Sequence, residues 1–153
     1  MSRIQLVLAL VVASSSQGVL AQEPPFTGKW SIDLRTPDQR ARGEDCGAAT
    51  FELKQAGERV TGEHSLATVR CGRLKEGTCN SVQGVATGRQ AILSVTSCRN
   101  GAIVIGKAER RGRNLHWRIV AEVKPGGPEG DSPLILGEGT LLMDSAKLPR
   151  HEP

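Results

Sequence analysis

The sequence predicts an all-β fold, namely an eight-stranded antiparallel up-and-down barrel, with a β-sandwich as the alternative. After residue 21 no stretch keeps a helical period, and short runs of alternating apolar and polar residues follow one another instead. Most turns between these runs are short, which joins neighbouring strands as hairpins. Four cysteines in a chain with two Phe, two Trp and no Tyr indicate disulfides that supplement a core poor in large side chains.

The alternating runs predict eight strands, at residues 28–34, 50–55, 59–69, 81–87, 91–97, 102–110, 114–123 and 134–143. Short turns that contain Gly57, Gly88, Gly101 and Gly112 separate four pairs of consecutive strands. Longer loops are expected at 35–49 and 124–133, the second of which is rich in Pro and Gly. The strands therefore form a meander of antiparallel hairpins.

Alternation also assigns the faces of the strands. In the first strand, Trp30, Ile32 and Leu34 share the expected core face. In strand 114–123 the expected core residues are Leu115, Trp117, Ile119, Ala121 and Val123. His116 and Arg118 alternate with them, so we expect both to face solvent.

A short pattern, a β-branched residue followed by any residue and Gly, recurs four times and ends at Gly62, Gly84, Gly106 and Gly137. The first three glycines stand 22 residues apart. Glycine weakens a strand, so its presence on the face of the β-branched residue needs a reason. Strands that coil sharply to close a small barrel use inward glycines where side chains would crowd. Coincidence in a chain with 18 glycines is the alternative.

Residues 1–21 have the features of a cleavable signal peptide. One positive charge, Arg3, precedes an apolar run at 5–13 that is too short to span a bilayer permanently. We expect cleavage after Ala21, a single barrel domain at 22–144 and a flexible tail at 145–153. A buried helix of a cytosolic protein is disfavoured, because Pro24 and Pro25 follow at once.

All four cysteines lie in the predicted mature chain, at Cys46, Cys71, Cys79 and Cys98. Their spacings of 25, 8 and 19 residues lack the close pairs of a zinc site, and an even number in an exported protein indicates two disulfides. Residues equidistant from a hairpin turn face each other, which favours Cys46–Cys71 with Cys79–Cys98. Cys71–Cys79 with Cys46–Cys98 stays open, since a meander places all four at one end.

The segment Thr27-Gly28-Lys29-Trp30 resembles the opening strand of the lipocalin, fatty-acid-binding and avidin group of barrels, and is most similar to avidins. The resemblance covers about nine residues and the strand count. It implies that Trp30 closes one end of the barrel and that the other end admits a small ligand. Avidins, however, hold biotin with a Tyr and several Trp, whereas this chain has no Tyr and only Trp117 besides Trp30. The resemblance therefore extends to the barrel and not to a biotin site.

In lipocalins an Arg on the last strand packs over the Trp of the first strand. The predicted last strand, 134–143, contains no Arg, so Lys147 or Arg150 would have to take that place.

The sequence contains no motif that predicts catalysis, a metal or a cofactor. His64, His116 and His151 are far apart in the sequence, and no nucleophile elbow, phosphate-binding loop or zinc-protease motif is present. His64 and Trp117 are the candidate binding residues. His64 shares a strand face with Gly62 and Leu66, which points it inward unless a register break turns it outward.

The cluster Arg110-Arg111-Gly112-Arg113 occupies a predicted hairpin tip, and Arg40 and Arg42 lie in the first long loop. Such clusters are either solvated turns or sites for anionic polymers. Removing Arg3 with the signal peptide leaves 19 basic and 16 acidic side chains, a net charge of +3. In an exported protein the partner would be an anionic envelope polymer or an acidic protein rather than nucleic acid.

Two functional hypotheses follow for this exported protein, whose expected location is the periplasm or the exterior. The first is a carrier that binds a small apolar or amphipathic ligand inside the barrel. The second is an envelope-associated protein-binding or inhibitor module that acts through its loops. A large interior cavity would favour the carrier, and a filled interior would favour the module.

Overall fold

The computed structural model describes residues 25–75, 79–128 and 131–145. The predicted signal peptide and almost all of the predicted tail lie outside these residues. The described elements are β1 (Gly28–Asp33), α1 (Pro37–Ala41), β2 (Cys46–Ala56), β3 (Arg59–Val69), β4 (Leu74–Lys75), β5 (Val82–Thr87), β6 (Gln90–Thr96), β7 (Ile103–Arg111), β8 (Asn114–Lys124) and β9 (Glu138–Met143).

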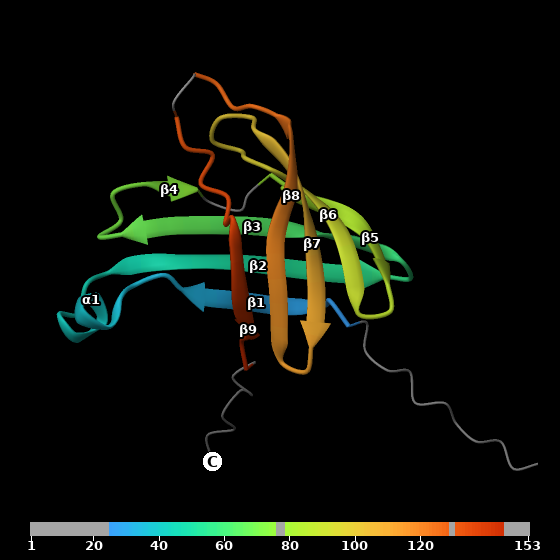
Figure 1. The fold of residues 1–153 in the computed structure, drawn as a ribbon, viewed down its shortest axis with the longest axis horizontal. Coiled ribbons are helices and arrows are strands. Elements are labelled where there is room, and N and C mark those ends of the chain that lie inside the picture. Colours follow the sequence, from blue (N-terminus) through green and yellow to red (C-terminus); the bar gives the residue numbers. More distant parts are fainter. Residues whose placement is uncertain (1–24, 76–78, 129–130, 146–153) are drawn as a thin grey trace, which may run out of the picture.

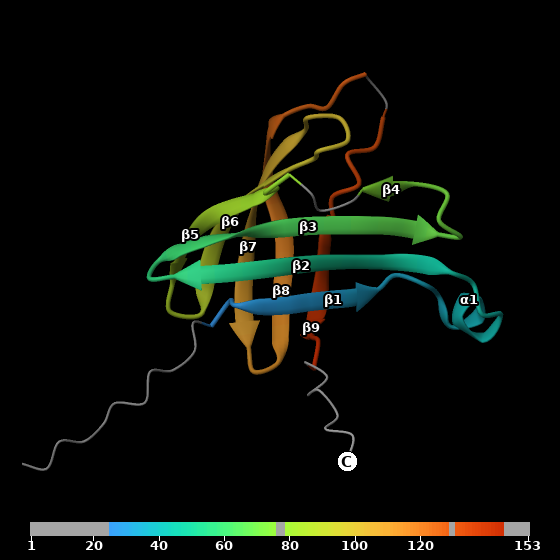
Figure 2. The same cartoon turned by 180° about the vertical axis from the view of Figure 1, so that it is seen from behind.

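Eight of the strands close into an antiparallel up-and-down barrel, which confirms the predicted fold class. The strands pair in chain order, and β1 then pairs with β9 to close the ring. The short strand β4 pairs only with the end of β3 and stays outside the ring. Figures 1 and 2 show β2 and β3 running across β7, β8 and β9, with the β2–β3 hairpin extending beyond them toward α1.

The helix α1 was not predicted, because five residues are too few to reveal a helical period. Its start nevertheless has a local signal in the sequence. Thr36 and Gln39 form a reciprocal capping box, and Pro37 occupies the first turn, where a missing N–H costs nothing. Helix α1 buries no residue, so it acts as a capped connection between β1 and β2.

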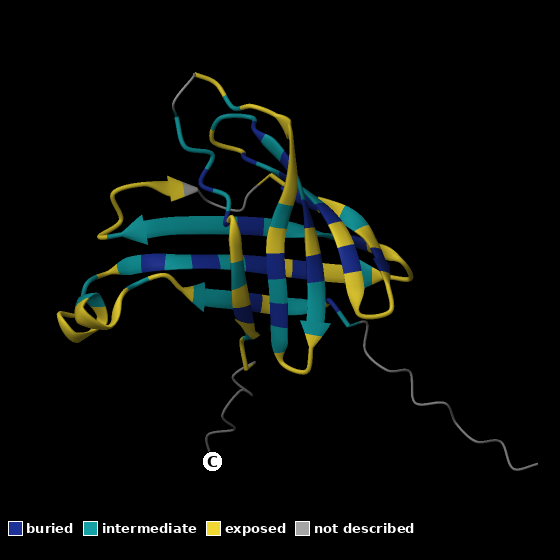
Figure 3. Cartoon of the chain, in the orientation of Figure 1, coloured by how far each residue is buried: buried dark blue, intermediate teal, exposed yellow. Residues whose placement is uncertain are grey.

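The core follows the predicted alternation along most strands, and Figure 3 shows buried and exposed bands alternating on β6, β7 and β8. Trp117 is its largest contributor on β8 and lies opposite a set of small inward residues. In register across β5 to β9 this row reads Ala86, Ala91, Ala108, Trp117 and Gly139. Trp117 is therefore the one large side chain in a row of small ones, in the way small barrels alternate large and small side chains.

Gly106 confirms the predicted role of an inward glycine, because a Cβ there would overlap the Trp117 ring. At Gly62 and Gly84 a Cβ would instead overlap the backbone of the adjacent strand. The prediction is wrong for Gly137, which lies outside any strand and has open space around it.

The face assignment fails at two strand ends. Ala121 and Val123 were predicted to be core residues, but both are exposed, Val123 by 61%. The register of β7 and β8 shifts between Ile105 and Gly106, and the end of β8 runs past the core. Leu34, which follows the end of β1, is 37% exposed for the same reason.

The last predicted strand, 134–143, is also shorter than expected, since β9 begins at Glu138. Leu134 has a φ of +50°, which interrupts an extended chain. Residues 131–137 are therefore not a strand. Leu134 and Leu136 are both buried in the core. We call residues 131–137 the plug segment.

Both disulfides have the favoured connectivity, Cys46–Cys71 and Cys79–Cys98. Their Cα atoms are 5.3 and 6.2 Å apart, within the usual range for disulfides. The first bridge closes the open end of the β2–β3 hairpin, between the first residue of β2 and the segment that follows β3. The second joins the segments that precede β5 and follow β6, and its cysteines lie next to Ser81 and Ser97, which are both buried.

The opposite end of the barrel is closed by Trp30, which is fully buried and donates its indole N–H to the carbonyl of Phe26 at 3.0 Å. Lys147 and Arg150, named above for the place over Trp30, lie outside the described residues. Among the described residues, Arg110 of β7 lies over the Trp30 ring. The guanidinium of Arg110 lies 5.7 Å from the ring centroid and donates to the carbonyl of Pro25 at 2.8 Å.

Candidate functional site

Leu136 occupies the mouth of the barrel, at the end away from Trp30. Its side chain joins the buried core. Its carbonyl accepts a hydrogen bond from the indole N–H of Trp117 at 2.7 Å, and its amide donates to Nε2 of His64 at 3.3 Å. Two interior side chains, one on β3 and one on β8, therefore bind both main-chain polar groups of a single residue.

His64 points inward and is fully buried, as its place on the strand predicts. An amide N–H can only donate, so Nε2 is the unprotonated nitrogen of this imidazole. The ring packs edge-on against Phe51, with centroids 4.6 Å apart, and Phe51 in turn lies 5.0 Å from the Trp117 ring. The two candidate residues, His64 and Trp117, are thus brought together through Phe51 and Leu136.

The strand pairing beside His64 is completed by a side chain. The His64 amide donates to Oγ of Ser81 at 2.7 Å, in place of a backbone carbonyl on the neighbouring strand. The carboxylate of Glu63 accepts from the amides of Cys79, Asn80 and Ser81, the shortest contact being 2.6 Å from Asn80. Glu63 and Ser81 therefore fix the chain where it enters β5.

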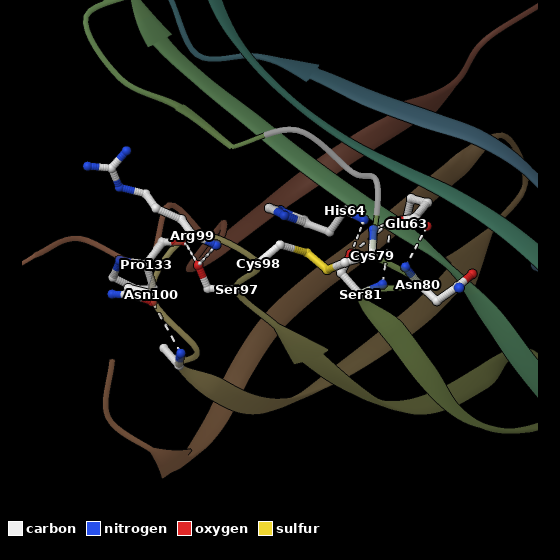
Figure 4. The surroundings of a disulfide bond; sticks show 11 residues. Glu63, His64, Cys79, Asn80, Ser81, Ser97, Cys98, Arg99, Asn100 and Pro133 are labelled. Carbon is white, nitrogen blue, oxygen red and sulfur yellow. Dashed lines mark hydrogen bonds between the residues drawn. A yellow bond between two sulfur atoms is a disulfide. The ribbon is translucent and has the colours of Figure 1, made fainter. Parts of the chain in front are cut away.

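Figure 4 shows the Cys79–Cys98 bridge between this group and a second one on the plug side. There, the hydroxyl of Ser97 donates to the carbonyl of Pro133 at 2.7 Å, and the Asn100 amide group donates to the carbonyl of Asp131 at 2.9 Å. The disulfide thus links the segment that supports His64 to the segment that holds the plug.

These contacts leave the mouth occupied by the protein itself. The plug segment supplies the apolar side chains. Barrel side chains form hydrogen bonds with its main-chain groups, so these buried polar groups have partners. The interior between Trp30 and Leu136 is lined by buried side chains that pack as one cluster.

The outer surface of β5 to β8 is built differently. A row of outward residues crosses five strands in register: Arg59 on β3, Val85 on β5, Ile92 on β6, Lys107 on β7 and Arg118 on β8. We call it the outer row. All five residues are exposed, including the two apolar ones, of which Val85 is 61% and Ile92 42% accessible.

A groove of about 470 Å³ runs over this surface and is lined by Val85, Ile92, Lys107 and Arg118 together with residues of the adjacent row. Two further open pockets lie elsewhere on the outside. One is at the closed end beside Arg110, with a volume of about 520 Å³, and one lies across β1 and β9, with a volume of about 670 Å³. All three are lined largely by surface residues and none encloses Leu136.

The groove has cationic side chains that form no salt bridge with any carboxylate of the described residues. Its own carboxylate, Glu109, is bound by Arg111 through two hydrogen bonds of 2.9 and 3.0 Å, which lower the pKa of Glu109. Lys107 and Arg118 form no salt bridge in the described part of the chain. The groove is therefore apolar on the Val85 and Ile92 side and positive on the other.

The predicted arginine cluster does not act as one site. Arg110 covers Trp30, Arg111 binds Glu109, and Arg113 donates to the hydroxyl of Ser145 at 2.7 Å. Their three guanidiniums have three different partners. His116 lies on the outer surface next to Arg118, and its Nδ1 is 3.0 Å from the hydroxyl of Thr140.

Within the described ranges, no three His, Cys, Asp or Glu side chains are grouped so that they could hold a metal ion. The same residues contain no helix with the length and apolarity that a membrane crossing requires. Sequence reasoning missed Leu136 and the outer row. Leu136 had been placed in a strand, and a row across five strands depends on their register, which one strand alone cannot reveal.

No protein-family model matches the chain, and searches of curated proteins and of solved structures found no match either. The resemblance to lipocalins and avidins therefore stays a prediction beyond the barrel itself.

Proposed function

We propose that this chain is an exported protein-binding module that binds its partner on its outer surface, with a structural rather than a ligand-carrying interior. The observation that carries the proposal is Leu136, whose side chain and both main-chain polar groups are held by the barrel. A small ligand would have to displace that residue and leave Trp117 and His64 without their hydrogen bonds.

The two disulfides are consistent with an oxidising compartment, periplasmic or extracellular. The proposal includes export with cleavage after Ala21. Sequencing of the mature N-terminus tests this step, and the expected first residue is Gln22.

The proposed contact surface is the groove over the outer row, where apolar and cationic groups are exposed side by side. Exposed apolar side chains in a recess mark interaction sites more often than isolated ones do. The test of this surface places a photo-crosslinking benzoylphenylalanine at Ile92. The control position is Val123 on β8, which is 61% exposed and lines none of the three pockets. Both proteins are irradiated in the cells that export them.

We expect a discrete protein adduct from Ile92 and none from Val123, with the crosslinked peptide identified by mass spectrometry. Adducts of equal yield at both positions, or none at Ile92, would contradict the proposal. The carrier hypothesis, in which a small apolar ligand binds inside the barrel, predicts no position-dependent adduct.

A further inference from the structure

The order of apolar and cationic groups along the outer row indicates which kind of partner segment it can bind. Two apolar side chains, Val85 and Ile92, stand between Arg59 on one side and Lys107 with Arg118 on the other. Neighbouring strands lie about 4.8 Å apart. Counted along the curved sheet from Arg59, the midpoint of the apolar pair is then about 7 Å away, Lys107 about 14 Å and Arg118 about 19 Å, so a peptide that spans the row follows the curve of the barrel.

An extended peptide matches this spacing. Its side chains on one face recur every two residues, or about 6.7 Å. Side chains at positions 1, 3, 5 and 7 of such a peptide therefore fall at about 0, 7, 13 and 20 Å. Position 1 meets Arg59, position 3 meets the apolar pair, and positions 5 and 7 meet Lys107 and Arg118.

The extent of the groove fits an extended chain laid across the strands. From Val85 to Arg118 the groove covers three strand spacings, about 14 Å, and Arg59 lies beyond its Val85 end. About four residues of an extended chain, at about 3.3 Å each, span that length.

The positive charges of the outer row determine which residues a bound peptide should carry. Arg59, Lys107 and Arg118 form no salt bridge with any carboxylate in the described part of the chain, and Glu109 is already bound by Arg111. Glu138, on β9, lies in register beside Arg118 at the end of the row, and no salt bridge joins the two in the described part of the chain. Positive groups thus flank the apolar pair on both sides, which complements acidic residues.

We propose that the outer row binds an extended acidic segment of a partner protein with the pattern acidic-x-apolar-x-acidic-x-acidic. The inference rests on the proposed protein-binding function and names the partner's recognition element. The apolar residue packs between Val85 and Ile92, and the three carboxylates pair with the three cations.

The test uses the full mature protein and a fluorescein-labelled peptide, Glu-Ser-Leu-Ser-Glu-Ser-Glu, in a fluorescence anisotropy titration at low salt. We expect saturable binding that weakens as salt is raised. The doubly substituted Lys107→Glu/Arg118→Glu protein should bind at least about tenfold more weakly, since two attractions become repulsions. Ile92→Ser should also weaken binding, and so should replacing the leucine of the peptide by glycine.

The matched control is Lys54→Glu, an exposed lysine on the outer surface of β2, away from the row. It changes the net charge by −2, half of the −4 in the double variant, and should leave the affinity within about twofold. If overall charge alone governed binding, Lys54→Glu would show about half of the double variant's loss on a logarithmic scale, and that result would overturn the proposal. Tighter binding to vesicles of anionic phospholipid than to the peptide would also overturn it.

The two proposals fail separately. If the Ile92 adduct persists unchanged in the Lys107→Glu/Arg118→Glu protein, the proposed protein-binding function is supported and the proposed acidic partner segment is contradicted. Loss of that adduct with no effect of Lys54→Glu supports both.

Discussion

The mouth of the barrel and the outer surface of β5 to β8 both combine apolar and polar side chains, but only those of the mouth are buried. At the mouth, the imidazole of His64 and the indole of Trp117 bind the main chain of Leu136, whose side chain is buried in the core. On the outer row, apolar and cationic side chains stand in register but remain exposed. The difference shows that polar groups with partners inside the barrel stabilise the fold. Exposed apolar and cationic groups without such partners are available to bind another protein.

The largest expected effect contrasts a residue of the interior with one of the outer row. Trp117→Ala removes the indole that fills the space beside Gly106 and leaves the Leu136 carbonyl without its donor. We expect a loss of about 3–5 kcal/mol in the free energy of unfolding, measured by urea denaturation. Ile92→Ala should change it by less than about 1 kcal/mol. Comparable losses in both variants would erase the distinction between the two regions.

The second prediction separates the two disulfides. Replacing both Cys79 and Cys98 by Ser opens a loop of 19 residues, which should cost about 3 kcal/mol, and replacing Cys46 and Cys71 should cost about as much. Only the first change should speed hydrogen exchange at the Leu136 amide beyond what the lost stability explains, because only that bridge lies between the supports of the plug segment. Equal acceleration in both variants would count against this link.

The third prediction compares two histidines. His64→Ala leaves the Leu136 N–H without its acceptor in a buried position and should cost about 2 kcal/mol or more. His116→Ala removes only a surface contact with Thr140 and should cost less than about 0.5 kcal/mol. Thermal unfolding followed by circular dichroism measures both, and a stable His64→Ala protein would show that the plug does not depend on that bond.

The smallest expected effect is the contribution of Asp33 to stability at low pH. Hydrogen bonds from the side chain and the amide of Arg35 lower the pKa of the exposed Asp33 to about 2. A carboxyl group with a folded-state pKa below its unfolded value stabilises the protein above the unfolded value, and this contribution is lost as the pH falls toward 2. An NMR titration of the Asp33 carboxyl carbon checks it. In Arg35→Gln the pKa should return toward 3.8, and an unchanged midpoint would contradict the assignment.

Much of the barrel could be predicted from the sequence, because period-two alternation and short glycine turns are local signals. The turns at Gly57 and Gly88 also fixed the hairpin register, which is why the disulfide connectivity was predicted correctly. The site was harder to predict. Leu136 continues an apolar run that resembles a strand, and only the fold shows that its backbone meets His64 and Trp117.

Arg110 illustrates the same limit. Its hairpin tip suggested a solvated cluster, whereas the closed end of the barrel places its guanidinium over Trp30. Pairing between residues 80 positions apart depends on barrel closure, which alternation within single strands does not specify.

The most direct test of the central claim, that the protein fills its own barrel, is native mass spectrometry of the protein purified from the cells that export it. We predict one species whose native and denatured masses agree and equal that of the chain from Gln22 with two disulfides. A small molecule that is retained in the native form, released on denaturation and lost in the Trp117→Ala protein would contradict the account.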